Sequence, residues 1–128
     1  MVTKLRIAPG SAALAGESVG SGDPVVFLHA GVCGSRMWGA QPDGVGASCK
    51  AIAYDRRGCG RTRAEAESFS AVADLMSVLS ATADAASAIL VGCSEGGRVA
   101  VDAVLRHPTA VRALILIAPS VTGAPAGA

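Results

Sequence analysis

The chain has 128 residues, of which 51% are hydrophobic and 16% are charged, and its formal net charge is +1. This length suits a single domain with a real core, and this composition excludes a disordered chain. A charge so close to zero provides no electrostatic field for nucleic acid or an anionic membrane, so we expect neither as a partner.

The four cysteines contain no C-x-x-C pair and show no clustering with histidine, so we expect no metal site. They are Cys33, Cys49, Cys59 and Cys93. Reduced thiols in a cytoplasmic protein are the simplest interpretation. No apolar run approaches the length of a membrane span.

The N-terminal part alternates apolar runs with turns. Weak strands are predicted at residues 5–8 and 14–18, and a strand buried on both faces is predicted at residues 25–28. A short helix is predicted over residues 35–41, ended by Pro42-Asp43-Gly44.

The middle of the chain continues this alternation. A buried strand is predicted at residues 51–54, and residues 56–67 are rich in charge and are typical of a loop. Apolar residues recur at helical spacing over residues 70–81, which predicts an amphipathic helix with Ser68 as its N-cap.

The C-terminal part predicts a strand at residues 89–91, a helix at 95–106 and a strong apolar strand at 111–118. Pro108 cannot continue the helix. Strands that alternate with helices indicate a parallel sheet with right-handed crossovers. We expect residues 1–120 to form this domain and residues 121–128 to be a linker-like tail.

Residues 92–97 read Gly-Cys-Ser-Glu-Gly-Gly, between the strand and the helix just described. G-x-S-x-G in this setting is the nucleophile elbow pattern, which holds a serine on a strained turn and projects its hydroxyl above the sheet. Side chains at Gly92 and Gly96 would collide with that turn. Ser94 is therefore the candidate nucleophile.

Two upstream loops complete a family pattern. Residues 29–38, His-Ala-Gly-Val-Cys-Gly-Ser-Arg-Met-Trp, resemble the H-G loop after the third strand of α/β-hydrolase-fold enzymes. Residues 54–62, Tyr-Asp-Arg-Arg-Gly-Cys-Gly-Arg-Thr, resemble the D-x-R-G-x-G-x-S/T loop after the fourth. The chain thus resembles the N-terminal portion of a serine-nucleophile, esterase- or lactonase-like enzyme. The resemblance implies a partial α/β-hydrolase fold, a mostly parallel sheet of about six strands with helices on both faces, lacking the last strands.

The resemblance also implies roles for individual residues. Ser94 would be the catalytic nucleophile, and the backbone N–H groups of Gly31 and Glu95 would form the oxyanion hole. Ala30 stands where the family usually has glycine. No cofactor and no metal ion is implied.

Three further residues would support the site structurally: His29, Gly92 and Gly96. Because a general base must reach the serine proton, and because the family uses the H-G histidine to brace its loop, we favour a structural role for His29 over a catalytic one. His107 ends the predicted helix and is interpreted as a partner for the helix C-terminus.

In the family an acid and then a histidine follow the serine along the chain. After Ser94 the acidic residues are Glu95 and Asp102, and the only histidine is His107. Asp102 is expected to form a salt bridge on the helix surface. We therefore expect a fragment of a larger enzyme, inactive on its own because it lacks the base.

The implied activity is cleavage of an ester, lactone or related acyl bond in a small molecule. Alternatives are a non-catalytic binding module, or a haloperoxidase, carbon–carbon bond hydrolase or acyltransferase on the same fold. The apolar strand at residues 111–118 would form an exposed edge, through which we expect the chain to self-associate.

Overall fold

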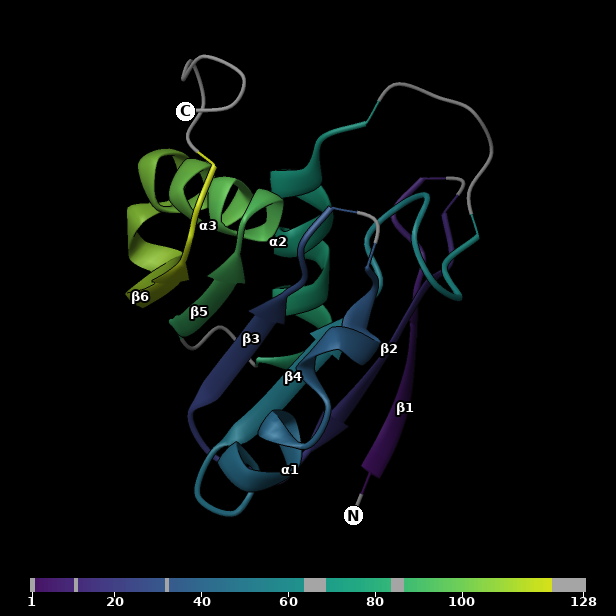
Figure 1. Cartoon of the computed structure of the whole chain (residues 1–128), viewed down its shortest axis with the longest axis vertical. Helices are drawn as coiled ribbons and strands as arrows, with labels where there is room; N and C mark the ends of the chain where they lie inside the picture. The colour runs from purple at the N-terminus through teal and green to yellow at the C-terminus, as the bar shows by residue number, and fades with distance from the viewer. Residues whose placement is uncertain (1, 11, 32, 64–68, 84–86, 121–128) are drawn as a thin grey trace.

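The computed structural model describes residues 2–10, 12–31, 33–63, 69–83 and 87–120. Six strands form one sheet in the order β1-β2-β4-β3-β5-β6 (Figure 1). The strands are β1 (Val2–Ile7), β2 (Leu14–Val19), β3 (Pro24–Leu28), β4 (Lys50–Tyr54), β5 (Ala88–Cys93) and β6 (Val111–Ile117). Strands β4, β3, β5 and β6 are parallel, whereas β1 and β2 add antiparallel pairs. The predicted mostly parallel sheet is therefore confirmed.

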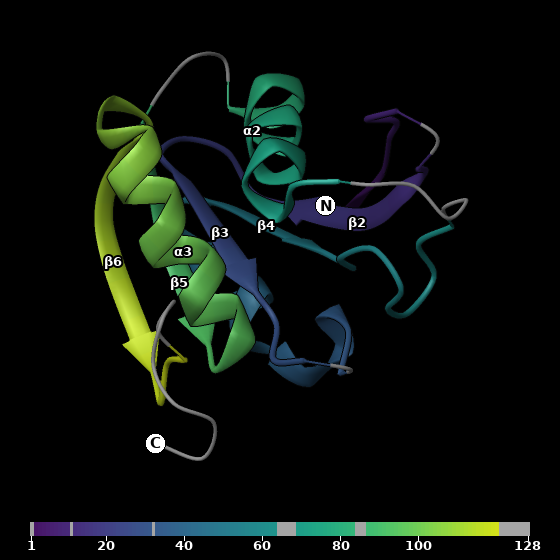
Figure 2. The same ribbon diagram turned by 90° about the horizontal axis from the view of Figure 1, so that it is seen from above.

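Helices cover both faces of this sheet, as predicted. The helices α2 (Ala71–Thr82) and α3 (Glu95–Arg106) lie side by side on one face (Figure 2). The short helix α1 (Gln41–Val45) and the 3-10 turn η1 (Ser35–Trp38) lie on the other face. A second 3-10 turn, η2 (Pro108–Ala110), leads from α3 into β6.

The apolar core consists of two clusters, one on each side of the sheet. The larger cluster, under α2 and α3, is built from alternate residues of the central strands, such as Val26 and Leu28, together with Leu75. On the opposite face Trp38 packs against Phe27, with the ring centroids 5.2 Å apart. Because both faces of β3 are covered, its continuous apolar sequence is explained.

The structure corrects the prediction of one helix over residues 35–41. The 3-10 turn η1 ends at Trp38, the chain turns at Gly39 with φ of +55°, and α1 then begins at Gln41. Pro42 was expected to end a helix, yet it lies in the first turn of α1. N–H groups in a first helical turn have no intrahelical acceptor, so proline is well tolerated there.

Other differences concern the ends of elements. The helix α3 has the predicted bounds, whereas α2 begins at Ala71 and is capped by Ser70, whose hydroxyl accepts from the Ala73 N–H at 3.2 Å. Ser68, the predicted cap, lies outside the described residues, and so do the predicted tail at 121–128 and part of the loop 56–67.

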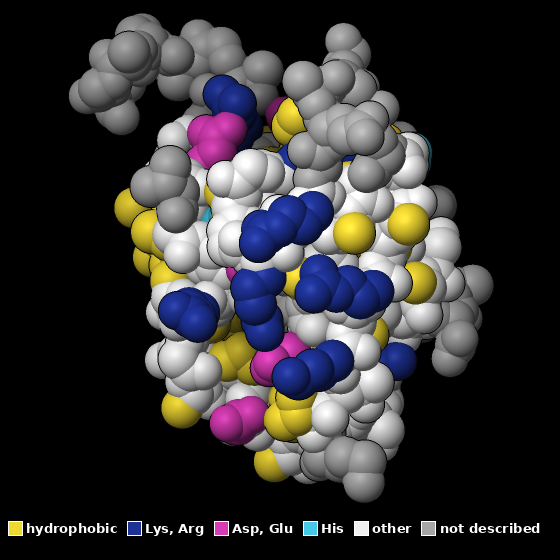
Figure 3. All heavy atoms as spheres, turned by 90° about the vertical axis from the view of Figure 1, so that its right-hand side faces the viewer, with side chains coloured by type: hydrophobic (Ala, Val, Ile, Leu, Met, Phe, Trp, Pro, Cys, Tyr) yellow, Lys and Arg dark blue, Asp and Glu magenta, His cyan; other side chains and the backbone are white. Residues whose placement is uncertain are grey.

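The two edges of the sheet differ in chemistry. Figure 3 faces the β1 edge and shows many Lys and Arg side chains on that side of the molecule; Lys4 and Arg6 of β1 are both exposed. At the opposite edge, β6 leaves Ile115, Leu116 and Ile117 between 38% and 52% exposed. Charged side chains on an edge strand disfavour pairing with another chain. The β1 edge is therefore protected against such pairing, whereas the apolar residues of β6 leave its edge open to it.

Candidate active site

Ser94 joins the end of β5 to the start of α3. Its φ is +53° and its ψ is −114°, a conformation that is costly for a residue with a Cβ. Its N–H donates to the carbonyl of Ile117 at 3.0 Å, and its carbonyl accepts from the N–H groups of Arg98 at 3.2 Å and Ser120 at 3.0 Å. Hydrogen bonds to α3 and to the end of β6 therefore hold the strained turn in place.

Gly92 and Gly96 both lie where no side chain fits. A Cβ on Gly92 would stand 2.7 Å from the Gly96 carbonyl oxygen. A Cβ on Gly96 would collide with the carbonyl of Leu28 and would stand 2.6 Å from that of His29. The two glycines therefore let α3 begin directly against β5 and against the end of β3.

The predicted oxyanion donors follow neighbouring strand ends. Leu28 of β3 pairs with Gly92 of β5 in parallel register, so the loop that contains Gly31 and the elbow start at the same edge of the sheet. Glu95 is the first residue of α3, and an N–H in that position has no acceptor within its own helix.

His29 is fully buried, and both of its ring nitrogens are engaged. Nε2 accepts from the main-chain N–H of Arg56 at 2.9 Å. The neutral ring therefore carries its proton on Nδ1, which lies 2.8 Å from the Ala30 carbonyl and donates to it. Burial lowers the pKa of His29 from its usual 6.5 and outweighs the opposing hydrogen bond to Ala30. His29 is thus held neutral and has no nitrogen free for a proton from Ser94.

These bonds also orient the peptide unit before Gly31. The Ala30 carbonyl accepts a second hydrogen bond, from the N–H of Cys33 at 3.1 Å. In a planar trans peptide the carbonyl and the next N–H point in opposite directions. The two donors to Ala30 therefore fix the direction of the Gly31 N–H as well.

Asp55, directly after β4, ties this region to the loop after β3. Its carboxylate accepts from the N–H of Ser35 at 2.6 Å and from the N–H of Arg61 at 2.9 Å. Burial alone would raise the pKa of Asp55, but these N–H bonds and the nearby Arg61 charge hold it below its usual value. The ionised carboxylate of Asp55 is therefore favoured, and its two oxygens brace two loops.

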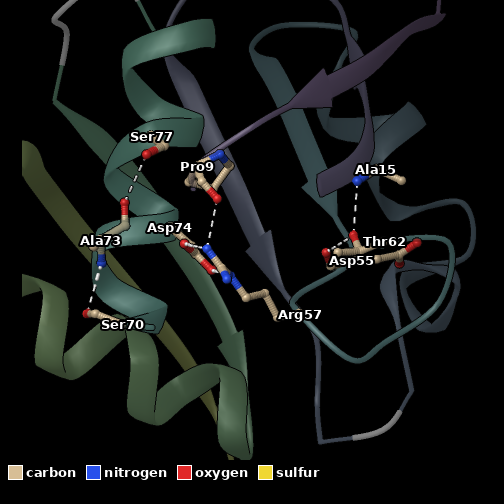
Figure 4. Close-up of polar contacts among 9 residues, drawn as sticks. All are labelled: Pro9, Ala15, Asp55, Arg57, Thr62, Ser70, Ala73, Asp74 and Ser77. Carbon is tan, nitrogen blue, oxygen red and sulfur yellow. Dashed lines mark hydrogen bonds and ion pairs between the residues drawn. The ribbon is translucent and has the colours of Figure 1, made fainter. Parts of the chain in front are cut away.

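Arg57 ties the same loop to α2 and to the N-terminal strands (Figure 4). Its Nε lies 2.8 Å from one Asp74 oxygen and its Nη2 lies 3.2 Å from the other, and both side chains are under 10% exposed. Nη2 also donates to the Pro9 carbonyl at 2.9 Å, and the guanidinium lies over the Phe69 ring at 4.8 Å. A bidentate ion pair of this kind fixes the relative orientation of the two side chains as well as pairing their charges.

Arg56 is the residue that the sequence interpretation missed. Its Nη2 donates to the His29 carbonyl at 2.6 Å, while its main-chain N–H holds the ring of the same histidine. The D-x-R-G motif leaves its position open, so the only signal in the sequence is that a second arginine precedes Arg57.

Among the residues that the structure describes, neither histidine is placed to act as a base for Ser94. Of the two histidines in the sequence, His29 is engaged and His107 caps the far end of α3, about 18 Å from the elbow at 1.5 Å per residue. Asp102 is half-buried on the same helix, and Arg98 lies 2.6 Å from Glu95. Within the described residues, no histidine is therefore available to complete a triad with Ser94.

Other chemistry is sparse in the part of the chain that the structure describes. No three His, Cys, Asp or Glu side chains gather there to hold a metal ion. Within the same residues, no helix combines the length and the apolar character needed to cross a bilayer. All four cysteines are free thiols.

A mostly parallel sheet with a serine at the turn from a central strand into a helix is the architecture of the α/β-hydrolase fold. Residues 25–128 match the model of the alpha/beta hydrolase family, and the chain belongs to that family. No curated protein sequence matches the chain.

Several solved hydrolases share the fold. Est816, described as an N-acyl homoserine lactone degrading enzyme, is 27% identical with a TM-score of 0.86, over 95% of this chain and 49% of its own. A thermophilic esterase from Thermogutta terrifontis is 26% identical with a TM-score of 0.82, over 92% and 46%. The epoxide hydrolase CorEH, at 21% identity, matches all of this chain and 46% of its own with a TM-score of 0.89, and shows the fold alone. The chain spans about half the length of these structures.

Proposed function

We propose that Ser94 is the nucleophile of a serine hydrolase that cleaves an ester, lactone or related acyl bond in a small molecule. The observation that carries this proposal is the positive φ of Ser94, a strained conformation that its neighbours hold in place. The lactone-degrading Est816 and the Thermogutta terrifontis esterase, the relatives above with more than 25% identity, support the acyl substrate class.

In the proposed reaction the Ser94 hydroxyl oxygen attacks the acyl carbon, the alkoxide leaves, and the serine proton passes to a base. The N–H groups of Gly31 and Glu95 donate to the oxyanion, and one such donor typically contributes about 3 kcal/mol. His29 keeps the Gly31 N–H aimed, while Gly92 and Gly96 let the elbow approach β3. No cofactor takes part.

Because neither histidine serves Ser94, we propose that the base and its orienting acid come from polypeptide outside these 128 residues. The chain alone is then expected to show little turnover, since removal of a triad base costs several orders of magnitude in rate. An external base can substitute for the missing one, which makes the role of Ser94 testable in this chain.

The test is acetylation of the chain by p-nitrophenyl acetate at increasing concentrations of imidazole. We expect an acetyl group on Ser94, located by peptide mass spectrometry, to form faster as imidazole rises and to persist because deacylation also needs a base. The Ser94→Ala variant should take up no acetyl group in that peptide. A folded wild-type chain that never acquires the adduct would count against the proposal.

A second candidate function is a non-catalytic module that binds through β6. The exposed side chains of Ile115, Leu116 and Ile117 favour it. We propose a second copy of this chain as the partner, since antiparallel pairing of β6 with β6 is self-complementary and closes as a dimer. The one charged residue of β6 does not oppose this pairing, because the Arg112 guanidinium already forms an ion pair with the Asp23 carboxylate at 3.0 Å.

A further inference from the structure

The loop after β4 contacts the proposed oxyanion loop, residues 29–31, at four points, and Arg56 provides three of them. Its guanidinium Nη2 lies 2.6 Å from the His29 carbonyl oxygen and 3.4 Å from Nδ1 of the His29 ring, and its main-chain N–H lies 2.9 Å from Nε2 of that ring. The fourth contact is from the Cys59 thiol, which donates to the Gly31 carbonyl at 3.3 Å. The oxyanion loop is therefore positioned from β4 as well as from its own strand.

Two of the Arg56 contacts act on different peptide units. The guanidinium holds the carbonyl of His29, which belongs to the peptide between His29 and Ala30. The main-chain N–H acts through the ring, because it keeps the ring proton on Nδ1, where it donates to the Ala30 carbonyl. That carbonyl belongs to the peptide whose other end is the Gly31 N–H.

The environment of Arg56 argues against a role in packing alone. The side chain is half-buried, and its Nε is buried without an acceptor among the described residues. Desolvation of a guanidinium is unfavourable, and an apolar side chain would fill the same space without that desolvation cost. What an apolar side chain lacks is the charge-assisted hydrogen bond to the His29 carbonyl.

We propose that Arg56 is a positioning residue of the oxyanion hole, which fixes the two peptide units that precede the Gly31 N–H. Its relevance to catalysis rests on the proposed function, because the Gly31 N–H takes part only if Ser94 attacks an acyl carbon. The positioning itself does not depend on turnover and is measured separately.

Three variants separate positioning from simple stability. Arg56→Met keeps the length of the side chain and removes its donors, and Arg56→Lys keeps the charge and one donor group. Arg63→Met is the control, because Arg63 lies in the same loop, is exposed, and pairs with Ala13 through its main chain, which the substitution keeps. Thermal unfolding of each variant reports its stability.

The readouts are the ¹⁵N order parameter of the Gly31 amide and the rate of imidazole-assisted acetylation of Ser94. For Arg56→Met we expect the order parameter of the Gly31 amide to fall from a rigid value of about 0.85 to below about 0.6. We also expect the acetylation of Ser94 to slow about tenfold. Arg56→Lys should recover part of both, and Arg63→Met should match the wild type in both.

An unchanged Gly31 order parameter in Arg56→Met overturns the proposal, whether or not Ser94 reacts. If Arg56→Met proves too unstable to study, an Arg56→Lys variant identical to the wild type in both readouts overturns it as well. A lower order parameter in a protein whose Ser94 never reacts supports the positioning and refutes the proposed function instead.

Discussion

Gly96 and Leu28 touch backbone to backbone: the Leu28 carbonyl occupies the space that a Cβ on Gly96 would need. This contact packs the first turn of α3 against the end of β3. It sets the Glu95 N–H and the loop that carries Gly31 in one fixed relation. A single close approach thus ties together the two segments that carry the proposed oxyanion donors.

We expect the Gly96→Ala variant to be destabilised, because its methyl group meets the backbone of Leu28 and His29 and neither can yield easily. Overpacking of this kind typically costs about 1–3 kcal/mol in the free energy of unfolding. Urea unfolding provides the measurement. The matched control is Gly44→Ala in α1, where nothing lies within 4 Å of the new methyl group among the described residues, and stability should stay level or rise.

Removal of one partner of the Arg57–Asp74 pair should destabilise the fold strongly. Both side chains are under 10% exposed, so Arg57→Met leaves a buried carboxylate at a typical cost of about 3–5 kcal/mol. The double variant Arg57→Met/Asp74→Leu should recover much of that loss in chemical denaturation. By contrast Arg112→Met breaks an exposed pair and should cost less than about 1 kcal/mol. Equal costs for the two single variants would refute the importance of burial.

Stability should depend on the ionisation of His29. Burial lowers the pKa of His29 in the folded chain, so the unfolded chain takes up this proton first as the pH falls. The contribution of His29 to the free energy of unfolding is complete above its usual pKa of 6.5 and is lost as the pH falls from 6.5 through the folded-state pKa.

Urea unfolding across this pH window tests the prediction. In the His29→Gln variant the fall in stability should be reduced, whereas the exposed His107 can be replaced by Gln with the fall retained. If His29→Gln and His107→Gln follow the same pH dependence as the wild type, the buried neutral histidine is not its source.

Self-association should depend on β6. The wild-type chain is expected to shift from monomer to dimer as its concentration rises, as measured by size-exclusion chromatography with light scattering. Ile115→Lys places a charge on the unprotected edge strand and should favour the monomer. Val2→Lys, at a 50% exposed position of β1, should leave the equilibrium unchanged. A wild-type monomer at every concentration would rule out β6 pairing between copies.

The sequence predicts what depends on local pattern. The helix α3 is recognised from Gly96 and Gly97 at its start and Pro108 after its end, and Ser94 from the strand and helix that flank it. The sequence does not predict the break between η1 and α1. The break depends on the positive φ of Gly39, and glycine adopts positive and negative φ about equally readily. The contacts of Arg56 were missed because a long side chain finds its acceptor only once β3 and β4 are paired.

The backbone of Ser94 forms two hydrogen bonds with the segment at the end of β6. Its N–H donates to the carbonyl of Ile117, and its carbonyl accepts from the N–H of Ser120. The outer edge of β6 therefore lies a single strand away from Ser94. Any segment that pairs with that edge, whether a neighbouring strand or a second copy, would stiffen the same chain that holds Ser94 in its strained conformation. Pairing along the β6 edge and the backbone conformation of Ser94 are therefore coupled through these two hydrogen bonds.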